Sequence, residues 1–155
     1  MKQPEKIQQE LVITRIFDAP REMVFRAWTE VEQIAQWWGP QGFTSPVCQM
    51  DVRPGGAIYI EMRGPDGTSY PMGGTFHKVV APERLVFTST ALPDESGNPQ
   101  LVNLNTVTFE DYNGKTRLKL HVQVMKATPA AAPALAGMEQ GWSRSLDRLA
   151  GFVGR

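Results

Sequence analysis

Residues 135–153, with the sequence LAGMEQGWSRSLDRLAGFV, have the longest helical pattern in the chain. Their apolar side chains recur at steps of three and four residues, which is the spacing of one stripe along an α-helix. At about 1.5 Å per residue such a helix is roughly 28 Å long, and we expect it to begin near Pro133. The stripe consists of Leu135, Met138, Trp142, Leu146, Leu149 and Val153.

The region before this helix has the pattern of a β-sheet. Its segments are rich in Val, Ile, Thr, Phe and Tyr, and turn residues separate them. Asn113-Gly114 is the strongest hairpin signal, and the short links predict an antiparallel meander. The predicted strands are 43–53, 57–63, 69–80, 84–92, 101–110 and 115–125. The long helix is therefore expected to bury its apolar stripe on this sheet.

Alternation along the predicted strands assigns their faces. In the last strand, one face carries Leu118, Leu120, Val122 and Val124, which we expect to meet the helix. The opposite face carries Lys119 and His121. Gly73-Gly74 lies inside a strand pattern, which indicates a bulge or a close approach by another group. Since a sheet that wraps around a helix must bend, curvature is the first interpretation there.

The N-terminal part adds a strand and a helical segment. A strand is predicted over residues 10–17, and apolar residues on both of its faces are compatible with both being covered. We expect Asp18-Ala19-Pro20 to open a helical segment, either as one helix or as two short helices with a bend near Thr29-Glu30. Gly39-Pro40 ends this segment. Residues 1–9 are expected to be a flexible lead-in, and residues 10–155 a single domain.

Composition and charge narrow the classes of function. The chain has 155 residues, 16 basic and 16 acidic residues, and one cysteine. Balanced charge without a basic run predicts no nucleic-acid partner. The N-terminal residues have no apolar signal region, and no apolar run is long enough for a membrane span. We therefore expect a cytoplasmic protein.

Few residues indicate chemistry. His77 and His121 have no metal-ligand spacing with another ligand, so we read them as exposed or structural histidines. Cys48 alternates with Met50 and is interpreted as a small buried hydrophobe rather than a nucleophile. Asp51 and Arg53 share a strand face, either as an ion pair beside a turn or as polar contacts at a pocket mouth. No catalytic residue, metal site or cofactor is predicted.

Apolar and aromatic side chains are more informative. As a set they suit a cavity between helix and sheet, lined by adaptable methionines and aromatic rings. For each residue alone, plain core packing is the competing interpretation. The candidate ligand-binding residues are Trp38, Phe43, Met50, Ile60, Met62, Tyr70, Met72, Phe76, Phe87, Met138, Trp142 and Leu146.

The predicted order of elements is that of a helix-grip fold, and several motifs support it. They are Ala19-Pro20, residues 24–29 (VFRAWT), Trp37-Trp38-Gly39-Pro40, residues 51–56 (DVRPGG), residues 62–67 (MRGPDG), residues 82–87 (PERLVF), residues 137–142 (GMEQGW) and residues 145–149 (SLDRL). In these motifs the sequence resembles the activator of heat-shock-protein-90 ATPase-like family, from about residue 11 to 153. That family belongs to the START-like (SRPBCC) superfamily. The resemblance implies an α+β fold in which a curved antiparallel sheet wraps a long C-terminal helix, with a deep pocket between them.

Three functions follow as hypotheses, because a fold does not fix an activity. The first is binding of a small hydrophobic molecule in that pocket. The second is a protein-interaction module, with a chaperone or a second copy of the chain in a homodimer as partner. The third is a cyclase- or hydrolase-type enzyme, which would need an inward polar group to move protons.

Overall fold

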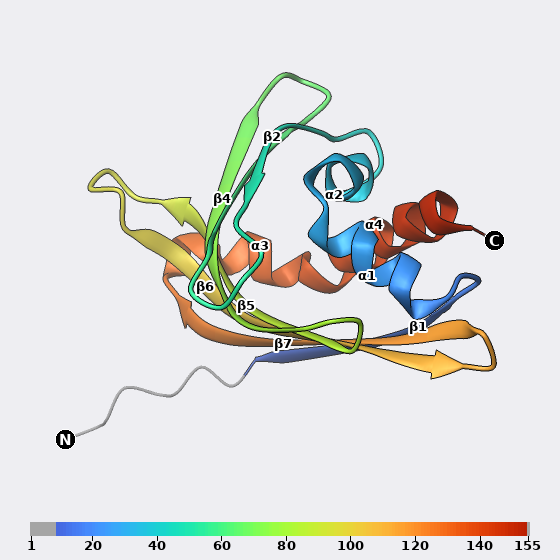
Figure 1. The fold of residues 1–155 in the computed structure, drawn as a ribbon. Coiled ribbons are helices and arrows are strands. Elements are labelled where there is room, and N and C mark those ends of the chain that lie inside the picture. The colour runs from blue at the N-terminus through green and yellow to red at the C-terminus, as the bar shows by residue number, and fades with distance from the viewer. Residues whose placement is uncertain (1–8, 155) are drawn as a thin grey trace.

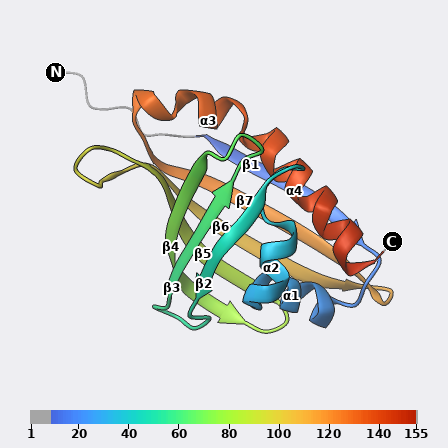
Figure 2. The same cartoon turned by 90° about the horizontal axis from the view of Figure 1, so that it is seen from above.

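The computed structural model describes residues 9–154. Of the predicted lead-in 1–9, residues 1–8 lie outside the described residues. A curved sheet wraps around helices on its concave side, with the C-terminal helix running across it (Figures 1 and 2). The elements are β1 (Glu10–Phe17), α1 (Arg21–Thr29), α2 (Val31–Trp37), β2 (Thr44–Met50), β3 (Ala57–Arg63), β4 (Ser69–Val80), β5 (Arg84–Pro93), β6 (Pro99–Tyr112), β7 (Lys115–Ala127), the 3₁₀ turn η1 (Pro129–Ala131), α3 (Ala132–Ala136) and α4 (Met138–Val153).

The sheet has seven antiparallel strands in the order β1-β7-β6-β5-β4-β3-β2. Strands β2 to β7 follow one another as hairpins, so the predicted meander is confirmed. The first strand pairs with the last, with Leu11 opposite Val122. The fold is therefore the predicted α+β helix-grip arrangement.

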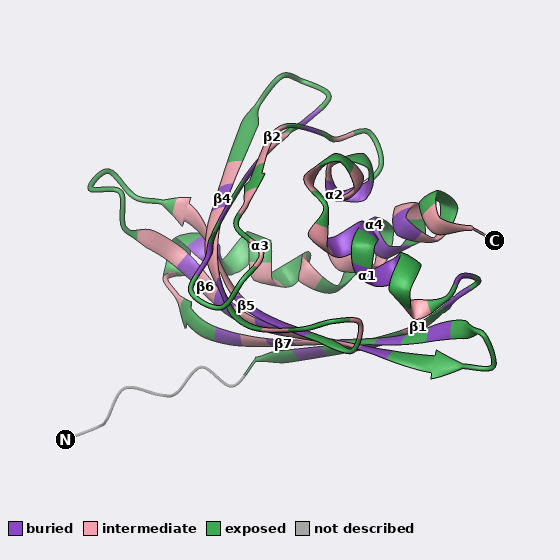
Figure 3. Cartoon of the chain, viewed as in Figure 1, coloured by how far each residue is buried: buried purple, intermediate pink, exposed green. Residues whose placement is uncertain are grey.

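Side chains alternate across the sheet as predicted for its main part. Leu118, Leu120 and Val122 on β7 are fully buried, whereas Lys119 between them is exposed. Figure 3 shows the same alternation of buried and exposed residues along β7 and β1. Only one face of β1 is covered, because Val12 and Ile16 on the other face are about half exposed, at 54% and 51%.

The helical segment after β1 bends where predicted. Glu30 has extended backbone angles, with φ −101° and ψ 127°, and separates α1 from α2. Gly39, with φ +95°, lies in the loop after α2. The two helices bury Trp28 and Trp37 against the concave side of the sheet.

The predicted C-terminal helix is divided at Gly137. This residue has φ −96° and ψ 3° and separates α3 from α4, and glycine inside a helix costs about 1 kcal/mol relative to alanine. As a result Leu135 joins a second apolar cluster with Leu101, Val124 and Ala131, away from the main core. Leu146 and Leu149 of α4 are fully buried in the main core.

The covering of α4 also differs from the prediction. Its stripe was expected to pack on the sheet, but its nearest backbone neighbours include α1 and α2 as well as β1. Figure 2 shows the two short helices lying beside α4 over the sheet. The short helices thus form one wall of any space next to α4.

The prediction of a bulge at Gly73-Gly74 was wrong, because both glycines pair regularly with β3 and β5. The register shift in β4 occurs instead between Phe76 and Lys78, at His77. The second interpretation, a close approach, is what the structure shows at Gly74. A Cβ there would lie 2.1 Å from the carbonyl oxygen of Thr88, so no larger residue fits without a backbone shift.

Candidate functional site

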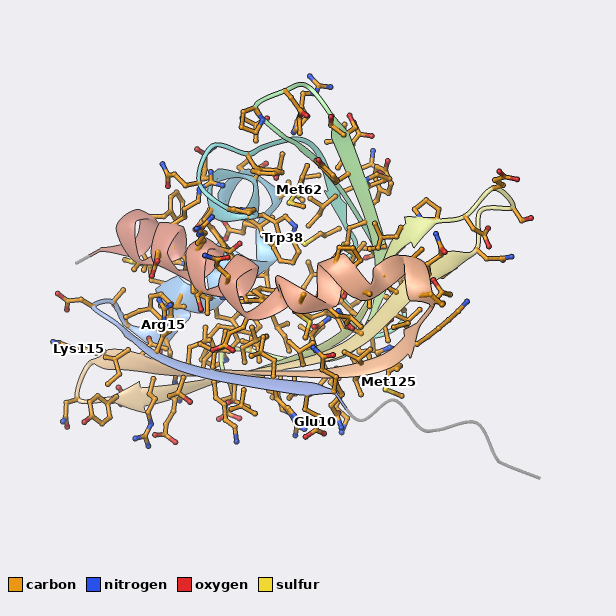
Figure 4. The ribbon with its side chains drawn as sticks, turned by 180° about the vertical axis from the view of Figure 1, so that it is seen from behind. Glu10, Arg15, Trp38, Met62, Lys115 and Met125 are labelled. Carbon is orange, nitrogen blue, oxygen red and sulfur yellow. The ribbon has the colours of Figure 1, made fainter. Side chains whose placement is uncertain are left out.

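An open groove lies between α4, the loop after α2 and the end of β3. Its volume is about 260 Å³. Figure 4 shows Trp38 and Met62 close to one another beside α4. We call it the Trp142 groove, and it is lined by Trp38, Gly39, Pro40, Met62, Met138, Gly141, Trp142 and Ser145.

One wall of the groove belongs to a cluster of all four tryptophans of the chain. Trp142 contacts Trp38 edge to face, with ring centroids 5.4 Å apart, and Trp38 contacts Trp37 at 5.8 Å. Trp37 in turn packs against Trp28 at 4.8 Å and donates its indole N–H to the Ala27 carbonyl at 3.0 Å. The cluster therefore joins the groove to the buried core.

Arg148 of α4 holds the loop that forms this wall. Its guanidinium donates to the carbonyl oxygens of Gln36 at 3.0 Å, Gly39 at 2.9 Å and Pro40 at 3.1 Å, with a longer contact to Trp38. The last carbonyls of a helix lack partners within it and favour a cation. Burial lowers the pKa of the Arg148 guanidinium from its ordinary value, but arginine stays charged in proteins. One side chain thus fixes the loop against α4.

Two of the residues that line the groove are glycines, Gly39 and Gly141. Gly39 has a positive φ of 95°, and a Cβ on it would lie 2.7 Å from the sulfur of Met62. Gly141 lies on α4, and an added Cβ there would meet no atom within 4 Å. The groove is therefore open at Gly141 and tightly packed at Gly39.

The interior of the fold is nearly full. The space between helices and sheet measures only about 10 Å³, which is at the lower limit for a single water molecule, roughly 10–15 Å³. The deep pocket that the resemblance implied is therefore not open in this structure. Large side chains occupy it, namely Trp28, Ile34, Trp38, Met50, Ile58, Ile60, Met72, Phe76, Leu85 and Phe87.

The predicted ligand-binding residues fall into three groups. Trp38, Met62, Met138 and Trp142 line the groove. Trp38 also lines the interior space, together with Met50, Ile60, Met72, Phe76 and Phe87. The remaining three line neither space: Leu146 is fully buried in the core, and Phe43 and Tyr70 pack on one another with ring centroids 5.8 Å apart.

Sequence reasoning missed the groove residues Gly39, Pro40, Gly141 and Ser145 as part of a site. Gly39 and Pro40 stood in a motif that resembled the family, yet only as the end of a helix. Gly141 and Ser145 stood in two more of these motifs, 137–142 and 145–149. Gly141 also offered a local signal, a glycine inside a helical pattern, which lowers helix stability and often has a packing or functional reason.

The charged and titratable candidates lie away from the groove lining. Arg53 and Asp51 form an ion pair at 2.7 Å between Nε and Oδ2, with side chains 72% and 50% exposed, as the first interpretation predicted. His77 is exposed, and its Nε2 lies 3.3 Å from the Thr88 hydroxyl. His121 faces away from the core, with Nε2 3.6 Å from Glu10.

Cys48 on β2 is half-buried and packs against the main core. Burial raises the pKa of its thiol, and the nearby Glu32 carboxylate raises it further. Since the thiolate is the reactive form, this supports the interpretation of Cys48 as a packing residue. Among residues 9–154 we find no group of three His, Cys, Asp or Glu side chains arranged for a metal ion. Within the same residues, no helix combines the length and apolarity needed to cross a membrane.

Comparisons with known proteins place this geometry in a family. A solved structure from Chromobacterium violaceum is 28% identical in sequence, with a TM-score of 0.81. The alignment covers 94% of this chain and 97% of that chain. One from Arthrobacter aurescens is 27% identical, with a TM-score of 0.81, over 93% of this chain and 85% of that chain. The AHSA1 protein from Silicibacter pomeroyi is 25% identical, with a TM-score of 0.76, over 92% of this chain and 96% of that chain.

The family assignment rests on a further comparison. No curated protein matches the sequence. A family model described as Activator of Hsp90 ATPase homolog 1-like protein matches residues 18–154, which include the helices, the sheet from β2 to β7 and every residue of the groove. The chain therefore belongs to the family of Activator of Hsp90 ATPase homolog 1-like proteins.

Proposed function

We propose that the protein binds a small apolar or aromatic molecule in the Trp142 groove. The observation that carries this proposal is the lining, because indole and thioether side chains from three elements face one open space of about 260 Å³. Ligand sites are mostly apolar clefts of about 300–1,000 Å³, so the groove is slightly smaller than that range. The fold and family support a ligand-binding or interaction module in general.

A larger ligand would have to enlarge the groove toward the interior. Trp38 lines both the groove and the interior space, so the two are adjacent at this ring. Methionine is unbranched and polarizable, and its side chain adapts to new neighbours at small cost. Met62 on the groove side and Met50 on the interior side are the side chains that would move first.

An alternative function is a protein-interaction module, in line with the chaperone named in the family description. The large exposed apolar residues on the outer face of the sheet stand among polar and charged ones. Val12 pairs with His121, and Ile16 pairs with Arg117. Single exposed apolar residues are normal on protein surfaces. This arrangement favours the groove over the sheet surface as the binding site.

Native mass spectrometry of the freshly purified protein, compared with the same sample after denaturation, tests the proposal. A bound molecule gives an added mass that disappears on denaturation. Titration with 1-naphthol and with 1-methoxynaphthalene by isothermal calorimetry adds a direct measurement. The proposal is contradicted if native mass spectrometry shows no added mass and calorimetry shows that neither probe binds.

Gly141 provides the matched variants. Because an added Cβ meets no atom within 4 Å there, a side chain at this position can start into the groove, and Gly141→Phe is expected to fill it. Phenylalanine is also a better helix former than glycine. We expect Gly141→Phe to lose binding of both probes while its melting temperature is maintained or raised. Gly141→Ala should keep binding within about fourfold, as a change of one methyl group predicts.

A further inference from the structure

The inner face of β6 is interrupted by two amides. Along this face Leu101, Val107 and Phe109 are buried apolar residues, as alternation in a strand requires. Between them Asn103 and Asn105 are also buried, at 8% and 0% exposure. Buried polar side chains cost free energy unless they are hydrogen-bonded, so this pair requires an explanation.

Both amides have an acceptor without a partner. The Asn105 amide nitrogen donates to the Phe87 carbonyl at 3.2 Å and to the Ser89 hydroxyl at 3.0 Å, and Oδ1 of Asn105 has no hydrogen bond. Because the Phe87 carbonyl needs a donor, these contacts fix which end of the amide is nitrogen. Oδ1 of Asn103 is likewise buried without a partner. Most buried polar atoms in proteins have one.

Asn103 lies next to a residue that lines the groove. The Asn103 amide nitrogen is 4.0 Å from the sulfur of Met138, and Met138 lines the Trp142 groove. Met138 also packs against both the main core and the second apolar cluster. Asn103 therefore lies near the boundary between these clusters, behind a flexible side chain that can move aside, and Asn105 follows it on the same buried face of β6.

We infer that Asn103 and Asn105 form the polar end of the ligand site and that the ligand is an apolar molecule with a hydrogen-bond-donating group, a hydroxyl or an amide N–H. This inference rests on the proposed function and names the class of ligand. A carbonyl oxygen accepts hydrogen bonds and repels an anion, so a neutral donor fits and a carboxylate end does not. The apolar part of the ligand lies between Trp38, Trp142 and Met62.

A matched pair of probes separates the donor from the apolar body. 1-Naphthol and 1-methoxynaphthalene share the ring system, but only the naphthol donates a hydrogen bond. One net hydrogen bond corresponds to about a three- to tenfold difference in affinity. We expect the protein to bind 1-naphthol more tightly by this factor, measured by isothermal calorimetry.

Asn103→Leu tests the residue. This variant keeps the approximate shape of the side chain. Among residues 9–154 the Asn103 amide nitrogen donates to the Met138 sulfur and to no backbone carbonyl, so no hydrogen bond to the backbone is lost. The preference for 1-naphthol should fall to within about twofold while 1-methoxynaphthalene binds as before. Asn98→Leu, in the exposed β5–β6 hairpin, is the control and should keep the preference.

The outcomes separate the inference from the proposed function. Equal binding of the two probes by the unchanged protein overturns the inference and leaves the groove as a binding site. A preference that persists in Asn103→Leu and in Asn105→Leu also overturns it. A crystal structure with 1-naphthol that places the hydroxyl within 3.2 Å of either Oδ1 supports it, whereas a hydroxyl directed to solvent contradicts it. If neither probe binds and native mass spectrometry detects no bound molecule, the proposed function itself fails.

Discussion

Trp142 of α4 stacks on Trp28 of α1, with ring centroids 6.0 Å apart and an angle of 20° between the ring planes. Trp28 is buried, at 2% exposure, whereas Trp142 is partly exposed and lines the groove. Trp142 is thus in contact with both the core and the groove. Its contributions to folding and to binding can be separated by comparison with a residue of α4 that lies only in the core.

We predict that Trp142→Ala weakens the binding of 1-naphthol at least tenfold. The ring supplies a large part of the apolar wall, and burying apolar area contributes about 25 cal/mol per Å². Leu149→Ala is the comparison, since Leu149 is fully buried and does not line the groove. That change should cost about 2–5 kcal/mol of unfolding free energy but leave the dissociation constant of the folded protein within twofold. Calorimetric titration and urea unfolding measure the two quantities, and equal losses of affinity in both variants would contradict the assignment of Trp142.

Arg148→Lys is predicted to destabilise the protein although it keeps the charge. The guanidinium donates to several carbonyls of the loop after α2 at once, and a lysine ammonium cannot reproduce that planar set of donors. Hydrogen bonds to charged groups contribute about 1.5–3 kcal/mol, which we discount to about 1–2 kcal/mol because Arg148 is only partly buried. For a domain of this size that is a fall of about 2–8 °C in melting temperature. Arg144→Lys, at an exposed position one turn earlier, should leave it unchanged, and an equal fall in both variants would reject this role of Arg148.

Much of the fold could be predicted from local patterns, because each pattern acts over a few residues. Asn113 and Gly114 both have positive φ, at 53° and 82°, as the hairpin turn favoured by this dipeptide requires. Alternation placed Leu118 and Leu120 on the buried face. The break at Gly137 was not predicted, since one glycine in an otherwise regular apolar stripe changes the periodicity very little.

The site was harder to predict, because its space depends on what side chains leave open. Gly39 and Gly141 contribute to the groove by the atoms they lack, so an inventory of aromatic and methionine residues could not include them. Asn103 and Asn105 lie on the same strand face as Leu101 and Val107, but their polar side chains give no sign in the sequence that this part of the face is buried. The filled interior follows from the packing of about ten side chains at once, which no local pattern records.

Cys48 is predicted to react slowly with iodoacetamide in the folded protein. Burial and then the Glu32 carboxylate raise the pKa of its thiol, so the folded state holds the thiol proton more tightly than the unfolded state. The stabilisation from this proton is complete below the ordinary thiol pKa of about 8.5 and is lost as the pH rises through the higher pKa of the folded state. The alkylation rate should therefore reach half its maximum at a higher pH than in urea. Glu32→Gln should move that pH down without reaching the value of the unfolded chain, and identical pH profiles in the folded and unfolded protein would contradict the prediction.

Gly39→Ala is predicted to destabilise the protein more than Gly55→Ala. Both glycines have positive φ, at 95° and 84°, so either alanine costs about 1–2 kcal/mol in backbone strain. A Cβ on Gly55 meets no atom within 4 Å, whereas a Cβ on Gly39 lies 2.7 Å from the Met62 sulfur and must displace it. Because the methionine side chain is flexible, we expect this displacement to add only a small cost. The additional loss in Gly39→Ala therefore measures the packing of Met62 against the groove wall, and combining it with Met62→Ala should remove the difference. Urea unfolding of the two single variants and the double variant measures this coupling, and an additive double variant would show that Met62 is not the residue that Gly39 accommodates.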